Sequence, residues 1–153
     1  MSWLLQLVHL LATAAWIGGM VFIKAILAPS LAVLEPPQRG RVMAGVARRF
    51  TILAWTSTAL LAVTGILKSP AGLLGDTTTG VGLLLTVKVA LFGAMVVVGS
   101  VITFGVAPKL VALAPAPGSA PGPAWVRAQR TLDALSGVNA LLGLAILGIV
   151  SAF

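Results

Sequence analysis

The chain contains no cysteine and no tyrosine, only one histidine, His9, and only three acidic residues among 153. The absence of cysteine excludes disulfide bonds, thiolate metal sites and CxxC redox chemistry. Charged residues make up 8% of the sequence, whereas a soluble domain carries about 25%. Hydrophobic residues make up 59%, and the mean hydropathy is +1.10. This composition predicts an integral membrane protein whose main partner is the lipid bilayer.

The few carboxylates also narrow the chemistry. Glu35, Asp76 and Asp133 all fall in expected loops or at a helix end, so no carboxylate lies deep enough in a span to relay protons. This argues against a proton-coupled transporter. No HExxH motif, phosphate-binding glycine loop or carboxylate pair is present. Because the net charge of +7 sits in short loops between apolar stretches, we expect no nucleic-acid partner.

The apolar stretches predict an all-α fold. A spanning helix needs about 20 apolar residues, and four stretches qualify, at about 3–27, 50–67, 80–106 and 132–153. Pro29 lies near the end of the first, and the third should stop before Pro108. We therefore expect a single domain over residues 1–153, an integral membrane bundle of four transmembrane helices. Residues 114–123 form a Pro/Gly/Ala linker.

The loops set an expected orientation. Seven of the ten basic residues lie in the connections between the first two and the last two stretches. The positive-inside rule places these connections in the cytoplasm and both termini outside. The N-terminus lacks a basic leader, so we expect no cleaved signal peptide. The expected location is a prokaryotic inner (plasma) membrane.

One stripe of the first stretch carries four side chains able to bind or stack, namely His9, Thr13, Trp16 and Met20. At about 100° per residue they fall within roughly 60° of one another. An imidazole in hydrocarbon is costly without a partner. The partner could be a neighbouring backbone or hydroxyl group, or His9 could ligate copper or be an axial ligand of haem iron.

Other candidates extend this site. Lys88 should lie in the same leaflet as His9, where it either approaches the histidine or snorkels to the head groups. Met20 and Met95 carry thioethers that suit Cu(I), although a lone methionine is more often a packing residue. Trp16 could stack on a flat cofactor or simply pack. One histidine per chain cannot give bis-histidine haem ligation without a homodimer.

Two small-xxx-small pairs, Ala14 with Gly18 and Ala15 with Gly19, accompany this stripe. Small side chains at this spacing permit close contact between helices, either within the bundle or across a homo-oligomer. We therefore assign Gly18 and Gly19 to helix packing.

Several motifs in order along the chain resemble the membrane domain of the copper resistance protein D (CopD) family. They are His9-xx-Ala12-xxx-Trp16-x-Gly18-Gly19-Met20-x-Phe22 with Leu27-Ala-Pro29, then Arg48-Arg49-Phe50-xxxx-Trp55 with Leu61-xx-Thr64-Gly65, then Lys88-Val-Ala-Leu-Phe92, and finally Leu141-Leu-Gly143-Leu. The resemblance implies a four-helix membrane unit linked to copper uptake or tolerance. A more distant similarity links the chain to HemJ-type protoporphyrinogen oxidases, in which a histidine of the first helix and a lysine of the third are linked to haem binding. That similarity would give these roles to His9 and Lys88.

Three functions follow as hypotheses. The first is copper binding or transport through an outer-leaflet site, with His9 and Met20 or Met95 as ligands. The second is a haem-b protein for electron transfer or a HemJ-like oxidase, with His9 as axial ligand, Trp16 stacking and Lys88 beside the haem. The third is a non-catalytic assembly subunit. The sequence leaves open whether the protein is an enzyme and whether its cofactor is copper or haem b.

Overall fold

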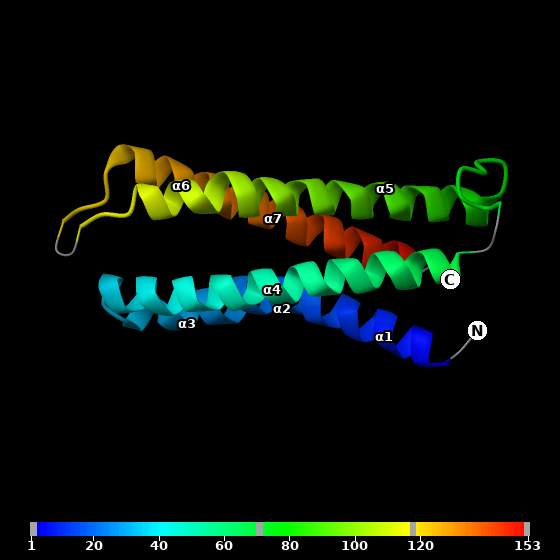
Figure 1. Cartoon of the computed structure of the whole chain (residues 1–153), viewed down its shortest axis with the longest axis horizontal. Helices are drawn as coiled ribbons and strands as arrows, with labels where there is room; N and C mark the ends of the chain where they lie inside the picture. Colours follow the sequence, from blue (N-terminus) through cyan, green and yellow to red (C-terminus); the bar gives the residue numbers. More distant parts are fainter. Residues whose placement is uncertain (1–2, 70–71, 117–118, 152–153) are drawn as a thin grey trace. The chain divides into compact units, whose positions relative to one another are not determined.

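The computed structural model describes residues 3–69, 72–116 and 119–151, and every element in this part of the chain is helical. Within these described ranges, four helical segments are long and apolar enough to cross a membrane: Trp3–Val33, Pro36–Lys68, Gly80–Ala112 and Pro123–Ile149 (Figure 1). The prediction of an all-α membrane protein with four spanning helices is therefore confirmed. The side of the membrane on which the termini lie stays a prediction.

The first span is a series of consecutive helical pieces rather than one regular α-helix. They are α1 (Trp3–Thr13), the π-helical turn η1 (Ala14–Gly18), α2 (Gly19–Phe22), a second π-helical turn η2 (Ile23–Leu27), α3 (Ala28–Ser30) and the 3₁₀ turn η3 (Leu31–Val33). The prediction that this helix ends at residue 27 was wrong. Proline lacks an N–H group, and its ring crowds the carbonyl four residues earlier. The widened turn η2 directly precedes α3 and accommodates Pro29, so the helix continues.

The remaining spans also run past their apolar stretches. They are α4 (Pro36–Lys68), the series α5 (Gly80–Ser100), η4 (Val101–Val106) and α6 (Ala107–Ala112), and α7 (Pro123–Ser151). The predicted starts at residues 50 and 132 were too late because α4 and α7 each begin at a proline, which fits the first helical turn, and carry arginines before their apolar part. The predicted stop before Pro108 was wrong because η4, another π-helical turn, precedes this proline.

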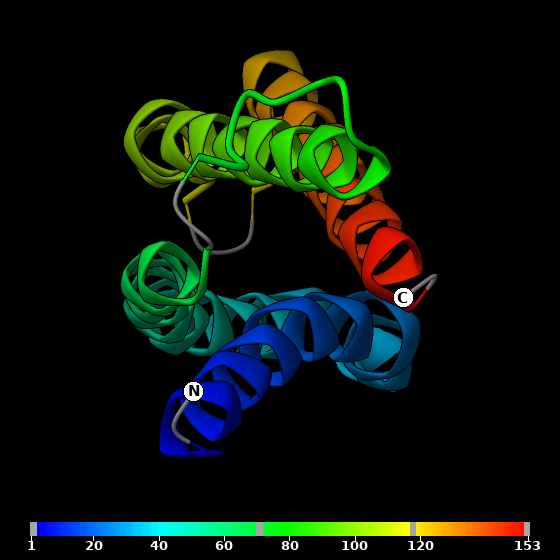
Figure 2. The same ribbon diagram turned by 90° about the vertical axis from the view of Figure 1, so that its right-hand side faces the viewer.

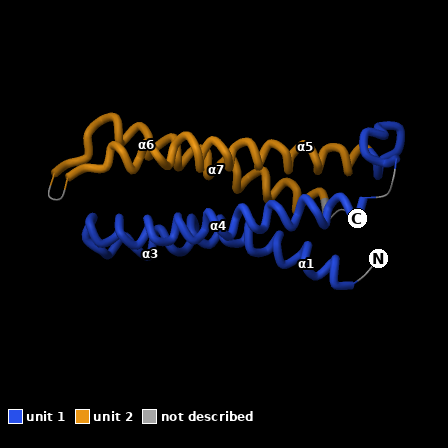
Figure 3. Tube along the Cα trace, viewed as in Figure 1, with its two compact units in different colours: residues 1–82 blue, residues 83–153 orange. Residues whose placement is uncertain are grey.

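The helices form two compact units, residues 1–82 and residues 83–153 (Figure 3). In the first unit the pieces of the first span pack antiparallel along α4, as the side and end views agree (Figures 1 and 2). In the second unit η4 and α6 pack against α7.

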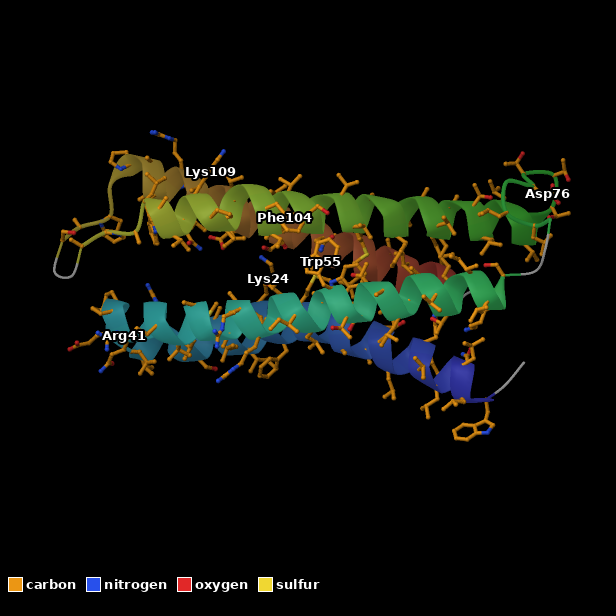
Figure 4. The ribbon with its side chains drawn as sticks, in the orientation of Figure 1. Lys24, Arg41, Trp55, Asp76, Phe104 and Lys109 are labelled. Carbon is orange, nitrogen blue, oxygen red and sulfur yellow. The ribbon has the colours of Figure 1, made fainter. Side chains whose placement is uncertain are left out.

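The connection before α5 is a hydrogen-bonded loop. Gly72 and Gly75 adopt positive φ angles of 83° and 86°. One oxygen of Asp76, which lies at this turn (Figure 4), accepts hydrogen bonds from the Thr78 amide (2.9 Å) and hydroxyl (2.6 Å). These bonds hold the pKa of the exposed Asp76 carboxyl below its usual value.

The same loop caps the start of α5. The Thr79 hydroxyl donates to the other Asp76 oxygen (3.1 Å) and accepts from the Gly82 amide (3.2 Å). A Cβ atom at Gly82 would lie 2.2 Å from the Asp76 carbonyl oxygen, so only glycine fits here without movement of the loop.

Candidate functional site

His9 is held by a hydrogen bond between two helices of the first unit. It lies on α1, is half-buried, and its Nδ1 atom lies 2.6 Å from the hydroxyl oxygen of Thr64 on α4. Thr64 is only 4% exposed. The two residues are 55 positions apart in the sequence, so the antiparallel packing of α1 on α4 creates the contact.

The surrounding hydrogen bonds define the tautomer of His9. The Thr64 hydroxyl donates to the carbonyl oxygen of Leu60 at 2.6 Å. A hydroxyl has a single hydrogen, so toward His9 its oxygen acts as the acceptor and Nδ1 of His9 carries the donated proton. In a neutral imidazole the other ring nitrogen, Nε2, then holds the lone pair. In this tautomer Nε2 is the ring nitrogen with the chemistry of a metal ligand.

A second polar pair lies one helical turn nearer the chain start. Lys68 of α4 donates a hydrogen bond to the side-chain oxygen of Gln6 on α1. Gln6 precedes His9 by three residues and Lys68 follows Thr64 by four, so the two pairs lie on the same facing stripes. Sequence reasoning missed this pair and treated Lys68 as a loop residue. The i, i+3 and i, i+4 spacings were the available signal.

Trp16 and Met20 lie deeper in the same unit. Trp16 belongs to η1 and is 4% exposed, and Met20 belongs to α2 and is 7% exposed. No proline follows η1 within a turn, unlike η2 and η4. A π-helical turn without such a cause is frequent at functional sites. Met20 follows His9 by 11 residues, about 16 Å along the helix at 1.5 Å per residue, so one ion cannot bond both side chains.

The other candidate residues lie in the second unit. Lys88, half-buried, and Met95, 1% exposed, both belong to α5. Their spacing of seven residues puts them on one face of that helix. Because His9 belongs to the first unit, the grouping of His9 with Lys88 or Met95 stays a prediction.

The two glycines assigned to packing, Gly18 and Gly19, differ in how closely a neighbouring side chain approaches them. A Cβ atom at Gly19 would lie 2.6 Å from the Phe50 ring, whereas a Cβ at Gly18 would meet nothing within 4 Å. The Phe50 ring of α4 therefore lies against the backbone of the first span at Gly19.

Metal-ligand clusters of the usual kind are not found in the described ranges. No group of three or more His, Cys, Asp or Glu residues there could hold a metal ion. A copper ion bound at His9 would need thioether, backbone or second-copy donors for its remaining coordination.

Comparison with known families adds to this geometry. The family model of copper resistance protein D matches residues 44–153, which include Thr64, Lys68, Lys88 and Met95. His9, Trp16 and Met20 precede the matched segment. No curated protein and no solved structure matches the chain, and the similarity to HemJ-type proteins is not shown. Because the match covers more than half of a chain with four apolar helices, the protein belongs to the copper resistance protein D (CopD) family.

Proposed function

We propose that this copper-resistance-related membrane protein binds copper as its cargo through Nε2 of His9. The observation that carries the proposal is the hydrogen bond from His9 Nδ1 to Thr64, whose own hydroxyl hydrogen is engaged by Leu60. Imidazole nitrogen suits copper. Metal-binding histidines usually donate their other ring N–H to a fixed acceptor, which sets the tautomer and the ring orientation. The family match supports copper as the ion.

The second ligand of the ion is a separate question, and of the two methionines predicted as ligands Met95 stays a prediction. A thioether suits Cu(I), and Met95 is the more deeply buried of the two. Met20 is too far along the first span from His9. A second copy of the chain could instead contribute its own His9, and this alternative predicts a copper-dependent homodimer.

We further propose the orientation that the basic connections favour. The connections 34–49 and 107–131 would face the cytoplasm of a prokaryotic cell, and both termini would face outward. The pairs His9–Thr64 and Gln6–Lys68 would then lie in the outer half of the membrane, near the point at which copper enters.

A copper titration of the full chain purified in detergent tests the site. We expect His9→Ala to abolish high-affinity Cu(I) binding, measured by competition with a chelator under reducing conditions. Met20→Leu should leave binding unchanged, because Met20 lies too far from His9 along the first span to share its ion. Met95→Leu, which conserves volume equally well, tests the remaining predicted thioether, and weaker binding in this variant would support it as a ligand. Wild-type affinity in His9→Ala would refute the proposal. A Soret band in the purified protein that is lost in this variant would indicate haem instead, and neither haem nor copper would indicate an assembly subunit.

The matched variants Thr64→Val and Thr64→Ser test the role of the hydroxyl. Valine removes it, and we expect copper affinity to fall 10- to 100-fold, the usual range for loss of a group that orients a ligand. Serine keeps it, and affinity should stay close to wild type. Equal affinities in both variants would contradict the role of Thr64.

A spectroscopic measurement separates the tautomer from copper binding. Because His9 is the chain's only histidine, [15N]histidine labelling gives one pair of ring-nitrogen signals. Without copper we expect a protonated Nδ1 and an unprotonated Nε2 in the wild type and in Thr64→Ser, and loss of this preference in Thr64→Val. The opposite tautomer in the wild type would remove the basis of the proposal even if copper binds.

A further inference from the structure

We propose that Arg48 and Arg49 of α4, together with Lys24 of the first span, form a docking surface for the phosphate groups of anionic phospholipids. We call this surface the basic collar and define it by Lys24, Arg48 and Arg49. It lies at the opposite end of the first unit from His9, and it does not depend on the copper proposal.

The length of α4 places part of it outside the hydrocarbon layer. Its 33 residues extend about 50 Å at 1.5 Å per residue, whereas the hydrocarbon core is about 30 Å thick. The apolar part of α4 begins at Phe50, and residues 36–49 carry all four arginines of this helix. These 14 residues therefore extend roughly 21 Å beyond the hydrocarbon.

The arginines of this extension lie at two levels. Arg48 and Arg49 directly precede Phe50, so they lie within the head-group layer, which is about 5–8 Å thick on each side. Arg39 and Arg41 lie a further 10–15 Å or so along the helix by its rise of about 1.5 Å per residue. They therefore lie beyond the layer of lipid phosphates.

Lys24 lies close to the level of Arg48 and Arg49, a few residues farther from the hydrocarbon. Phe50 lies against Gly19, and the first span runs antiparallel to α4, so Lys24 lies five residues beyond the hydrocarbon boundary. Figure 4 shows Lys24 between Trp55 and Arg41 along the length of the unit. The collar therefore draws on both helices.

The net positive charge of residues 24–49 favours an anionic ligand. Residues 24–49 contain five basic side chains and one acidic side chain, Glu35, and all four arginines are exposed. A guanidinium group can bind a phosphate through two parallel hydrogen bonds. Near an anionic membrane surface each basic residue contributes about fivefold in affinity. The position of the collar beside the hydrocarbon selects lipid phosphates as the occupant.

Native mass spectrometry of the full chain with added phosphatidylglycerol or phosphatidylcholine tests this proposal. We expect the wild type to retain phosphatidylglycerol in preference, and Arg48→Ala/Arg49→Ala to weaken that binding about 25-fold, since two fivefold contributions are lost. The matched variant Arg39→Ala/Arg41→Ala removes the same charge from the same helix, and we expect it to bind like the wild type.

Further outcomes decide the proposal. Equal retention of the two lipids by the wild type, or equal losses in both double variants, would overturn it. Displacement of the lipid by millimolar inorganic phosphate would indicate a site for free anions and would also overturn it. Arg48→Lys/Arg49→Lys keeps the charge and should retain the preference, which separates a binding defect from a folding defect.

Discussion

Gly18 and Gly19 are adjacent, but only one of them is constrained by a neighbour. The Phe50 ring occupies the position of a side chain at Gly19, and nothing lies within 4 Å at Gly18. We expect Gly19→Ala to be less stable than Gly18→Ala by about 1–3 kcal/mol, the usual cost of overpacking. Thermal unfolding in detergent measures the difference, and Phe50→Leu in the Gly19→Ala background should reduce it. Equal melting temperatures for the two glycine variants would contradict this packing.

The sequence singled out His9, but it did not identify the residue that forms a hydrogen bond with its side chain. A single imidazole inside an apolar stretch must have a partner, and a hydroxyl was one of the expected kinds. Thr64 of the second span donates to the carbonyl of Leu60 in its own helix. That its oxygen also accepts from His9, 55 residues away, depends on the register of α1 on α4. The sequence pattern does not define that register.

At the scale of elements, the start of α5 depends on a glycine. A Cβ atom at Gly82 would meet the Asp76 carbonyl oxygen, and nothing lies within 4 Å of such an atom at Gly80. Gly82→Ala should displace the Thr79 cap and destabilise the chain by about 1–2 kcal/mol, the usual value of a helix cap. Gly80→Ala is the matched control. Unfolding followed by circular dichroism compares them, and identical stabilities would exclude this close approach.

The stabilising effect of the Asp76 carboxylate on its loop should depend on pH. Its hydrogen bonds from Thr78 lower the pKa of the carboxyl in the folded chain, so its stabilising effect is complete above the unfolded-state pKa, about 4. The effect is lost as the pH falls through the lower folded-state pKa. We expect the Thr78 amide resonance to be constant from neutral pH to about pH 4 and to move below it. An inflection at higher pH, or the same titration in Asp76→Asn, would contradict this assignment.

Helix ends were the least predictable elements. Hydropathy locates the apolar part of each span, but α4 and α7 begin earlier, at Pro36 and Pro123, and arginines lie between these starts and the apolar parts. Pro29 and Pro108 suggested helix ends, yet the widened turns η2 and η4 allow the helix to pass each proline. A π-helical turn arises from local backbone adjustment and leaves no composition signal.

At the scale of the whole molecule, four spans and family membership could be predicted from composition and motif order. The proposed orientation makes a direct prediction because the chain has no cysteine. A single cysteine at Thr77→Cys should react with a membrane-impermeant maleimide in intact cells. Ser119→Cys, between the last two spans, should react only after the membrane is opened. The reverse pattern would invert the orientation and place the His9 end of the first unit on the cytoplasmic side.

The link between His9 and Thr64 joins two neighbouring helices. The imidazole belongs to one helix and the hydroxyl that aims it belongs to the other, so an axial shift of either helix redirects the lone pair of Nε2. A ligand that bonds this nitrogen must then oppose an axial shift of one helix along the other. By thermodynamic reciprocity, any force that slides the helices must change the affinity for that ligand.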